Sequence, residues 1–405
     1  MPSAMHPRAE AGDELAGAMT GGGGGGGGGR GEGAGPDWMG AFRASARPAC
    51  AMIEATRRMI ALMDKLGEAR RRSVRIAETP KDTVWQQGKV TLSRYRADPA
   101  VPERRYGPLL IVHGLVGRQS MTDLEPRRSL VRRLLAAGVD TFVLDWGNPT
   151  RADRYCDMTD YADHRLGDAV EAALEVAERP RAALLGICQG GVFAAAHAAL
   201  YPERLAALAL AVTPIDCHAD AAAPVPGRGQ LNLWLRSLPE DLVDRLIDDS
   251  GMVPGALAAT VFNGLTPGRT AAKYTADLME IAGDPDALDT FLRMEKWLSD
   301  RPDQPGELAR EWLVGLYREN RLATGRLSLD GRPVRLENIS CPVLNIYARD
   351  DHIVPPPCSR ALKNHLQNVA YRELEVPTGH IGAFVSPRGL DLVAPAMTAL
   401  LAQAA

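Results

Sequence analysis

A cysteine flanked by glycines is the feature of this sequence best suited to covalent chemistry. The apolar run 182–187 leads into Gly186-Ile187-Cys188-Gln189-Gly190, and the Ala-rich segment 192–200 follows. An apolar run, a G-x-C-x-G turn and an Ala-rich segment are typical of a strand, a sharp turn and a helix. Glycines two residues to either side let neighbouring backbone approach, and the first turn of a helix favours a thiolate. The pattern predicts a nucleophile elbow carrying Cys188, although a buried cysteine beside a glycine-rich turn would share it.

A carboxylate and an imidazole occur at the positions that such a cysteine needs. Asp351 comes just after the predicted strand 342–347, and His380 just after the predicted strand 371–376. Ligands of open α/β sheets bind at the carboxyl ends of the strands, so these side chains should lie near Cys188. Histidine can hold a thiol as thiolate and move protons, while a carboxylate orients the imidazole or takes a proton itself. We therefore predict a catalytic triad of Cys188, His380 and Asp351.

The elements that must position this triad indicate an α/β fold. Candidate strands alternate with helical segments, which implies a mostly parallel, doubly wound sheet. Between residues 217 and 340 this alternation lapses into helical patterns, which we interpret as a cap inserted over the carboxyl edge of the strands. Residues 79–216 and 341–405 then form the catalytic core, and the order nucleophile, acid, histidine is that of the α/β-hydrolase fold. The predicted strands are a hairpin at 84–85 and 90–92, then 109–113, 141–145, 182–187, 206–212, 342–347 and 371–376.

The N-terminal part of the chain differs from the rest in composition. Residues 1–38 include nine consecutive glycines, and such a segment cannot bury enough apolar surface to offset its ordering entropy, so we expect a disordered tail. Residues 39–78 carry apolar side chains at helical spacing among arginines and lysines. We expect an amphipathic helical segment there, which could pack on the body, on a partner or on an anionic or hydrophobic surface.

Composition excludes several classes of protein. The chain has 405 residues, of which 45% are hydrophobic and 24% charged, as in an ordinary soluble enzyme. A net charge of −3 argues against a nucleic-acid partner. No window reaches roughly 18 unbroken apolar residues, so no transmembrane segment is expected, and the six cysteines lack metal-site spacing, so no metal is expected. We expect a cytoplasmic protein with reduced thiols.

At this point the sequence resembles a known family, the polyhydroxyalkanoate synthases, and within it the class III catalytic subunit. The likeness spans roughly residues 40–400. Gly-Ile-Cys-Gln-Gly-Gly together with Arg-Met-Glu-Lys-Trp is much more specific than a generic lipase box. The residues that carry it are Thr79-Pro80-Lys81, Ser120-Met121-Thr122-Asp123-Leu124, Asp145-Trp146-Gly147, Gly186 to Gly191, Val212-Thr213-Pro214, Phe291 to Trp297, Asp351-His352 and Gly379-His380-Ile381-Gly382.

The resemblance implies polymerisation of (R)-3-hydroxyacyl-CoA into a polyester with release of CoA. Cys188 would carry the growing chain as a thioester, His380 would deprotonate the thiol, and Asp351 would act as base toward the incoming 3-hydroxyl. It implies no cofactor, because CoA enters as part of the substrate, and it leaves the residues that contact CoA unassigned. It also implies a second, non-catalytic synthase subunit as partner and a place at the surface of the polyester granule, and we expect a homodimer.

One departure from the family bears on the oxyanion site. Where the family usually has Ala-Leu-Val-Asn-Arg, this chain has Gly114-Leu115-Val116-Gly117-Arg118, preceded by His113. A His-Gly pair is common there in ordinary hydrolases, whose following loop supplies an oxyanion N–H. We expect the backbone N–H groups of Val116 and Gln189 to serve, with Leu115 as a substitute.

Two other functions remain open at this point. A cysteine-dependent α/β hydrolase acting on a polyester, a thioester or a lactone, as a depolymerase, thioesterase or dienelactone hydrolase-like enzyme does, would use the same triad. An inactive scaffold or granule-binding subunit would require the triad to be vestigial.

Overall fold

The computed structural model describes residues 74–101, 103–222, 229–247, 249–265 and 267–404. All of them belong to one compact unit, residues 58–405. The predicted tail, residues 1–38, and nearly all of the predicted helical segment, residues 39–78, lie outside the described residues. Residues 74–78, the end of that segment, form no helix.

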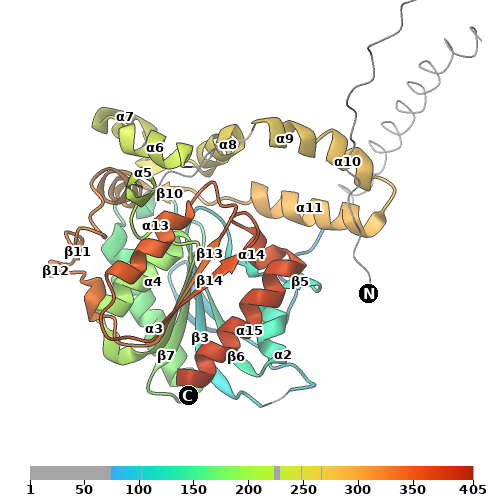
Figure 1. Ribbon diagram of the computed structural model, residues 1–405, viewed down its shortest axis with the longest axis vertical. Coiled ribbons are helices and arrows are strands. Elements are labelled where there is room, and N and C mark those ends of the chain that lie inside the picture. Colours follow the sequence, from blue (N-terminus) through green and yellow to red (C-terminus); the bar gives the residue numbers. More distant parts are fainter. Residues whose placement is uncertain (1–73, 102, 223–228, 248, 266, 405) are drawn as a thin grey trace, which may run out of the picture. The chain divides into compact units, whose positions relative to one another are not determined.

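A mostly parallel sheet forms the centre of the protein, as predicted (Figure 1). Its strand order is β1-β2-β6-β3-β7-β8-β13-β14; β1 and β2 form an antiparallel hairpin, β2 is antiparallel to β6, and the remaining pairs are parallel. The crossovers between parallel neighbours bring the carboxyl ends of these strands to one edge. The strands are β1 Lys81–Gln87, β2 Val90–Tyr95, β3 Tyr106–His113, β6 Val139–Asp145, β7 Ala182–Ile187, β8 Leu205–Ala211, β13 Val343–Ala348 and β14 Tyr371–Val376.

Helices cover both faces of the sheet because its inner strands are apolar on both sides. In β3, Leu110 and Val112 face one core, whereas Leu109 and Ile111 face the other, as the two-residue period of a strand requires. The first core is closed by α3 (Leu166–Ala177) and α4 (Gln189–Leu200), and the second by α2 (Leu130–Ala136) and α15 (Pro387–Ala404). Figure 1 shows the two pairs on opposite sides of the sheet. No described helix is long and apolar enough to span a membrane.

The chain between β8 and β13 leaves the sheet and forms a row of helices beyond one end of the strands (Figure 1). Its longest helix is α11, whose first turn is capped by the Asp284 carboxylate, which accepts hydrogen bonds from the Asp286 and Ala287 amides. The elements are α5 Ala219–Ala222, α6 Gln230–Ser237, α7 Glu240–Leu246, β9 Met252–Val253, α8 Gly255–Leu265, α9 Pro267–Lys273, α10 Ala276–Ile281, α11 Pro285–Ser299, β10 Gln304–Pro305, α12 Gly306–Arg310 and the π-helical η5 Glu311–Arg318.

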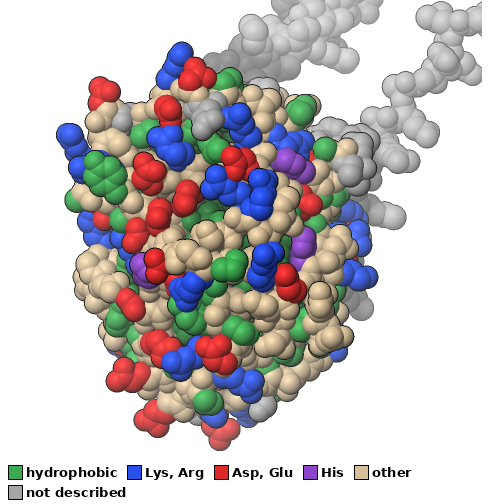
Figure 2. Space-filling model, turned by 90° about the vertical axis from the view of Figure 1, so that its left-hand side faces the viewer, with side chains coloured by type: hydrophobic (Ala, Val, Ile, Leu, Met, Phe, Trp, Pro, Cys, Tyr) green, Lys and Arg blue, Asp and Glu red, His purple; other side chains and the backbone are tan. Residues whose placement is uncertain are grey.

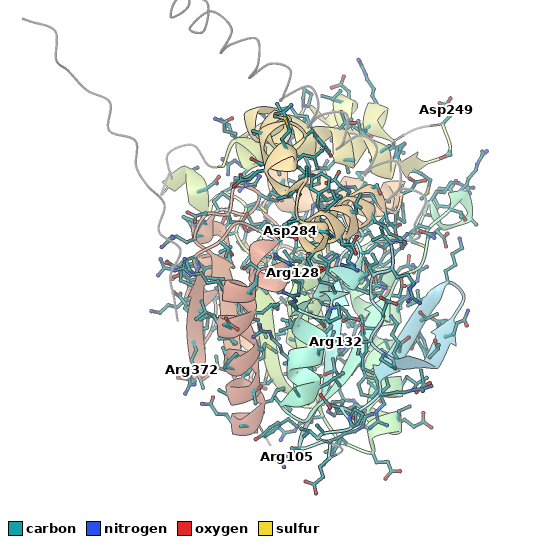
Figure 3. All side chains as sticks on the ribbon, turned by 90° about the vertical axis from the view of Figure 1, so that its right-hand side faces the viewer. Arg105, Arg128, Arg132, Asp249, Asp284 and Arg372 are labelled. Carbon is teal, nitrogen blue, oxygen red and sulfur yellow. The ribbon has the colours of Figure 1, made fainter. Side chains whose placement is uncertain are left out.

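Helix α11 is anchored to the body of the protein. The Glu125 carboxylate at the end of β4 (Asp123–Glu125) accepts hydrogen bonds from Thr290 Oγ1 at 3.0 Å and from Arg293 Nη1 at 2.9 Å. Figure 3 shows Asp284, at the start of α11, near Arg128 of the short strand β5 (Arg128–Ser129). The start and the middle of α11 are therefore attached to the body of the protein.

The end of the segment predicted as cap packs on the body instead. Beyond η5 the chain forms the hairpin β11 (Ser328–Leu329) and β12 (Arg332–Pro333) and the turn η6 (Leu336–Asn338), which contacts α4. Leu329, Val334 and Leu336 are buried in the core on that face, and Arg332 pairs with Asp163, which precedes α3. These apolar side chains place residues 328–338 in the body, although the sequence pattern assigns them to the cap.

The outer surface carries mixed charge. On the face in Figure 2, hydrophobic side chains lie singly or in small groups between acidic and basic ones. Such a pattern is ordinary for a protein surface and indicates no docking site by itself.

Close packing at the β7–α4 turn leads to a stability prediction. A Cβ added at Gly190 would lie 2.3 Å from the carbonyl oxygen of Val112, whereas a Cβ at Gly264, exposed in α8, would meet nothing within 4 Å. We expect Gly190→Ala to lower the free energy of unfolding by about 1–3 kcal/mol, because the strand backbone must move. Gly264→Ala should raise it by roughly 0.5–1 kcal/mol through its helix propensity. Urea denaturation of both variants tests this, and equal stabilities would contradict it.

Candidate active site

Cys188 lies at the turn between β7 and α4 in a strained backbone conformation. Its φ is 53° and its ψ is −118°, outside the regions that a residue with a Cβ ordinarily adopts. Its own N–H donates to the Ala211 carbonyl at 2.9 Å, which fixes the turn to the neighbouring strand β8. The side chain therefore projects from the carboxyl edge of the sheet at the start of a helix, where the sequence predicts the nucleophile elbow.

Three small residues make this turn possible. A Cβ at Gly186 would lie 2.6 Å from the Cα of Gly191, and a Cβ at Gly191 would lie 1.9 Å from Thr213 Oγ1. The sequence motif predicts the need for Gly186 and Gly190, while the contact of Gly191 with the chain after β8 appears only in the structure. The turn is packed tightly against β3 and β8, so the cysteine cannot easily relax from its strained position.

Asp351 and His380 are brought together beside Cys188. His380 Nδ1 donates to Asp351 Oδ2 at 2.7 Å, and Asp351 is completely buried. The other carboxylate oxygen, Oδ1, accepts hydrogen bonds from the amides of Ile353 and Val354, each at 2.9 Å. Both oxygens of Asp351 thus accept hydrogen bonds from within the protein, and neither is exposed. This geometry favours orientation of the imidazole over the expected direct contact of Asp351 with an incoming hydroxyl.

His380 experiences opposing influences on its pKa. Burial lowers the pKa, but the Asp351 carboxylate and the charge on the Cys188 sulfur raise it more, and the net result is a pKa of about 10. At neutral pH this environment favours a protonated imidazole beside Cys188. A neighbouring cation generally favours the thiolate, which is the form in which a cysteine attacks an acyl carbon.

The predicted oxyanion donors lie at the same place, with one correction. Val116 and Cys188 line a common cavity, and no hydrogen bond of the described residues uses the Val116 N–H. The Gln189 N–H is in the first turn of α4 and so has no intrahelical acceptor. Leu115 is excluded as a substitute, because its N–H donates to Gln189 Oε1 at 2.7 Å.

The cap holds the loop that contains Val116 from the other side. Trp297 Nε1, at the end of α11, donates to the Arg118 carbonyl at 2.9 Å, and Arg301 Nη1 donates to the Val116 carbonyl at 2.7 Å. The Arg118 guanidinium pairs in turn with Asp300 at 3.0 Å. The loop is thus fixed on one side by the Gln189 side chain and on the other by Trp297 and Arg301 of the cap. The orientation of the Val116 amide depends on both sets of contacts.

Two cavities meet at Cys188. One, of about 80 Å³, lies between the predicted triad and the cap and includes His113, Val116, Cys188, Phe262, Trp297 and His380 in its lining. The other, of about 130 Å³, is apolar and extends beneath α6, α8 and η5, with Leu231, Trp234, Leu257, Phe262, Trp312 and Tyr317 among its lining residues. Cys188, Val116, Phe262 and Ile353 belong to both. The thiol thus faces an apolar space suited to an acyl group.

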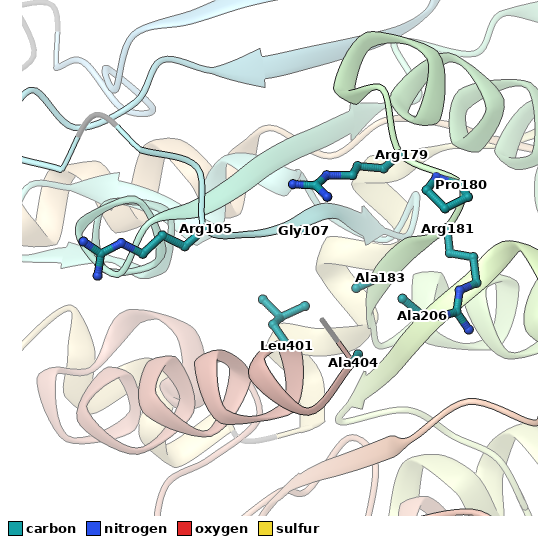
Figure 4. Close-up of a pocket in the computed structure, with 9 residues that line it drawn as sticks. All are labelled: Arg105, Gly107, Arg179, Pro180, Arg181, Ala183, Ala206, Leu401 and Ala404. Atoms are coloured by element: carbon teal, nitrogen blue, oxygen red, sulfur yellow. The ribbon is translucent and has the colours of Figure 1, made fainter.

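A separate cavity of about 160 Å³ lies where the strands begin (Figure 4). Arg105, Arg179 and Arg181 line it, together with Gly107 of β3, Ala183 of β7 and Ala206 of β8. Because Cys188, Asp351 and His380 are at the carboxyl edge of the same sheet, this cavity is on the opposite edge and takes no part in the candidate site.

Sequence reasoning missed Arg301 and Phe262, both of which line the cavity of the triad. Trp297 had a signal, because it ends the Arg-Met-Glu-Lys-Trp run, but the run does not reveal its contact with Arg118. Arg301 and Phe262 have no motif, and only the path of the cap brings them to Cys188.

Comparison with known proteins agrees with this architecture. Residues 107–387 match the family model of the alpha/beta hydrolase fold. Poly(3-hydroxyalkanoate) polymerase subunit PhaC of Allochromatium vinosum is 38% identical over 319 residues, which cover 79% of this chain and 87% of that protein. The subunit of the same name from Thiocystis violacea is 38% identical with the same coverage. That of Synechocystis is 35% identical over 352 residues, which cover 87% of this chain and 92% of the relative. The chain therefore belongs to the α/β hydrolase fold family and, within it, to the poly(3-hydroxyalkanoate) polymerase subunits.

Proposed function

We propose that this chain polymerises (R)-3-hydroxyacyl-CoA into a poly(3-hydroxyalkanoate), releases CoA, and carries the acyl chain as a thioester on Cys188. The observation that carries the proposal is the 2.7 Å hydrogen bond between His380 and buried Asp351 beside the strained Cys188. The names of the relatives, poly(3-hydroxyalkanoate) polymerase subunits, support the same reaction. They do not favour a cysteine-dependent hydrolase.

In the first half of the reaction, the Cys188 thiolate attacks the thioester carbonyl of the acyl-CoA. The N–H groups of Val116 and Gln189 donate hydrogen bonds to the oxyanion that forms. When this intermediate collapses, the bond to the CoA sulfur breaks, and the CoA thiolate takes a proton from His380 Nε2. The acyl group is then held on Cys188, and His380 is neutral.

In the second half, the 3-hydroxyl of one acyl group attacks the thioester of another. His380 Nε2 accepts the hydroxyl proton while the new ester bond forms and the Cys188 sulfur leaves as thiolate. Asp351 keeps Nδ1 protonated and directs Nε2 toward the reaction centre. The chemistry is an acyl transfer without a change of oxidation state, so it requires no cofactor besides the CoA of the substrate.

A covered, apolar site supports transfer to an alcohol rather than to water. Phe262 and Trp297 of the cap line the apolar cavity at Cys188, and such a lining limits the water that is held near the thioester. A covered site must also open for substrate. We therefore propose that a second, non-catalytic subunit assists opening, that the chain forms a homodimer, and that it acts at the surface of its polyester granule. Exposed Leu233, Trp234 and Tyr274 on the cap support such contacts.

Cys188→Ser should nearly abolish polymerisation. The serine hydroxyl has a far higher pKa than a thiol, and its oxyester is a poorer acyl donor, so we expect kcat to fall about 10³-fold or more. The matched control is Cys156→Ser, which changes a half-buried thiol away from the triad and should retain most activity. CoA release and polymer formation from 3-hydroxybutyryl-CoA are measured together. Free 3-hydroxybutyrate as the main product would favour the hydrolase instead.

Asp351→Asn should make Cys188 less reactive at pH 8. The carboxylate is the largest of the influences that raise the pKa of His380, so its loss lowers that pKa from about 10 and leaves less of the imidazole protonated. We expect iodoacetamide to alkylate Cys188 several-fold more slowly, because a neighbouring imidazolium favours the reactive form of a cysteine. Asp350→Asn removes a neighbouring carboxylate that pairs with Arg349 and should change the rate less than twofold. Peptide mass spectrometry measures the rate of alkylation. Equal rates in the two variants would refute the role of Asp351.

Addition of the second subunit should raise activity several-fold and remove an initial lag. A partner that binds the open cap better than the closed cap shifts the equilibrium toward the open form. Activity is measured with the isolated chain and with the co-purified pair, and the oligomeric state by light scattering. Full activity without a lag in the isolated chain, unchanged by the second subunit, would disprove the dependence on a partner.

A further inference from the structure

His113 is a titratable residue of the active-site cavity that the proposed mechanism does not use. It is the last residue of β3 and is buried, and its side chain lines the same cavity as Cys188 and His380. Its ring is held close to the loop that follows, since Nδ1 lies 3.0 Å from the Gly114 carbonyl oxygen. A Cβ at Gly117 would lie 3.4 Å from its Cε1, so the glycine leaves room for the ring.

The contact with Gly114 determines which ring nitrogen can accept a hydrogen bond. A carbonyl oxygen can only accept, so Nδ1 carries the proton and Nε2 of the neutral ring has a free lone pair. No described residue forms a hydrogen bond with Nε2. Among the described residues, the polar side-chain atoms that are fully buried without a partner do not include Nε2. Burial lowers the pKa of His113, the Gly114 contact opposes this, and His380 and Arg301 lower it further, to about 4. The ring is therefore neutral at pH 7.

The other side chains that line the 80 Å³ cavity offer a substrate hydroxyl no comparable acceptor. Asp351 is completely buried and does not line the cavity, and His380 serves the sulfur of Cys188. Trp297 and Arg301 can only donate. The other side chains of the lining, such as those of Met121, Ile187, Val212 and Phe384, are apolar. A hydroxyl placed in such a space without a partner loses its hydrogen bonds to water.

We propose that His113 is a specificity-determining residue, whose Nε2 accepts a hydrogen bond from the 3-hydroxyl of the acyl group that is transferred to Cys188. This inference rests on the proposed function. An acyl group that lacks the hydroxyl leaves the Nε2 lone pair unsatisfied in an apolar cavity, so the site selects 3-hydroxyacyl groups over simple acyl groups.

Two substitutions separate this role from a structural one. The side-chain amide of His113→Asn can still donate to Gly114 in place of Nδ1–H, but it has no atom at the position of Nε2. His113→Gln has the opposite effect. Its longer side chain places an amide where Nε2 of the imidazole was, but it cannot donate a hydrogen bond to the Gly114 carbonyl. Acylation of Cys188 is measured by rapid quench and peptide mass spectrometry with 3-hydroxybutyryl-CoA and with butyryl-CoA.

The ratio of the acylation rates with 3-hydroxybutyryl-CoA and with butyryl-CoA decides whether His113 recognises the 3-hydroxyl or has only a structural role. We expect the wild type to prefer 3-hydroxybutyryl-CoA roughly tenfold, His113→Asn to lose the preference, and His113→Gln to retain part of it. The opposite ranking, or equal slowing with both substrates, overturns the proposal. If Cys188 of the wild type is acylated equally fast by both substrates, the proposal is overturned even if neither variant folds. Absence of any label on Cys188 of the wild type would instead reject the proposed function.

Discussion

The strained conformation of Cys188 is the constraint on which the rest of the structure depends. A residue with a Cβ is held at a φ of 53° only if its surroundings leave it no alternative, and the cost is of order 1–3 kcal/mol. Here β3 and the chain after β8 supply that restraint, through contacts so close that Gly190 and Gly191 have no space for a methyl group. The sheet order therefore matters for chemistry as well as for stability, because β7 must lie between these two neighbours.

Two histidines of one cavity illustrate how local contacts decide protonation. His380 and His113 are both buried, and burial lowers the pKa of each. His380 faces the Asp351 carboxylate and the Cys188 sulfur, so its pKa rises above the usual value, whereas His113 faces only a carbonyl and cationic groups. One ring is thereby suited to giving and taking protons, and the other to accepting a hydrogen bond without being charged.

The strands, and the grouping of Cys188, Asp351 and His380 at one edge of the sheet, could be derived from sequence because each has a local signal. Runs such as 182–187 are apolar on both faces, and polar residues placed just after such runs must gather at one edge of a parallel sheet. The contacts between distant segments had no such signal. The Gln189 side chain occupies the Leu115 amide, and Trp297 reaches Arg118 across 179 positions of the chain. The sequence pattern places residues 328–338 in the cap because two-residue strands such as β11 are too short to show a period.

The attachment of the Val116 loop to the cap has a consequence for the fate of the acyl-enzyme. The loop is bonded to Trp297 and Arg301, so a cap that lifts takes two of its hydrogen bonds away. Entry of solvent and loss of the preorganised oxyanion donor then occur in the same movement. In the mechanism that we propose, water that enters an open site meets a thioester whose hydrolytic transition state keeps the Gln189 donor but loses the fixed Val116 donor, so hydrolysis of the polymer chain is slowed during each opening.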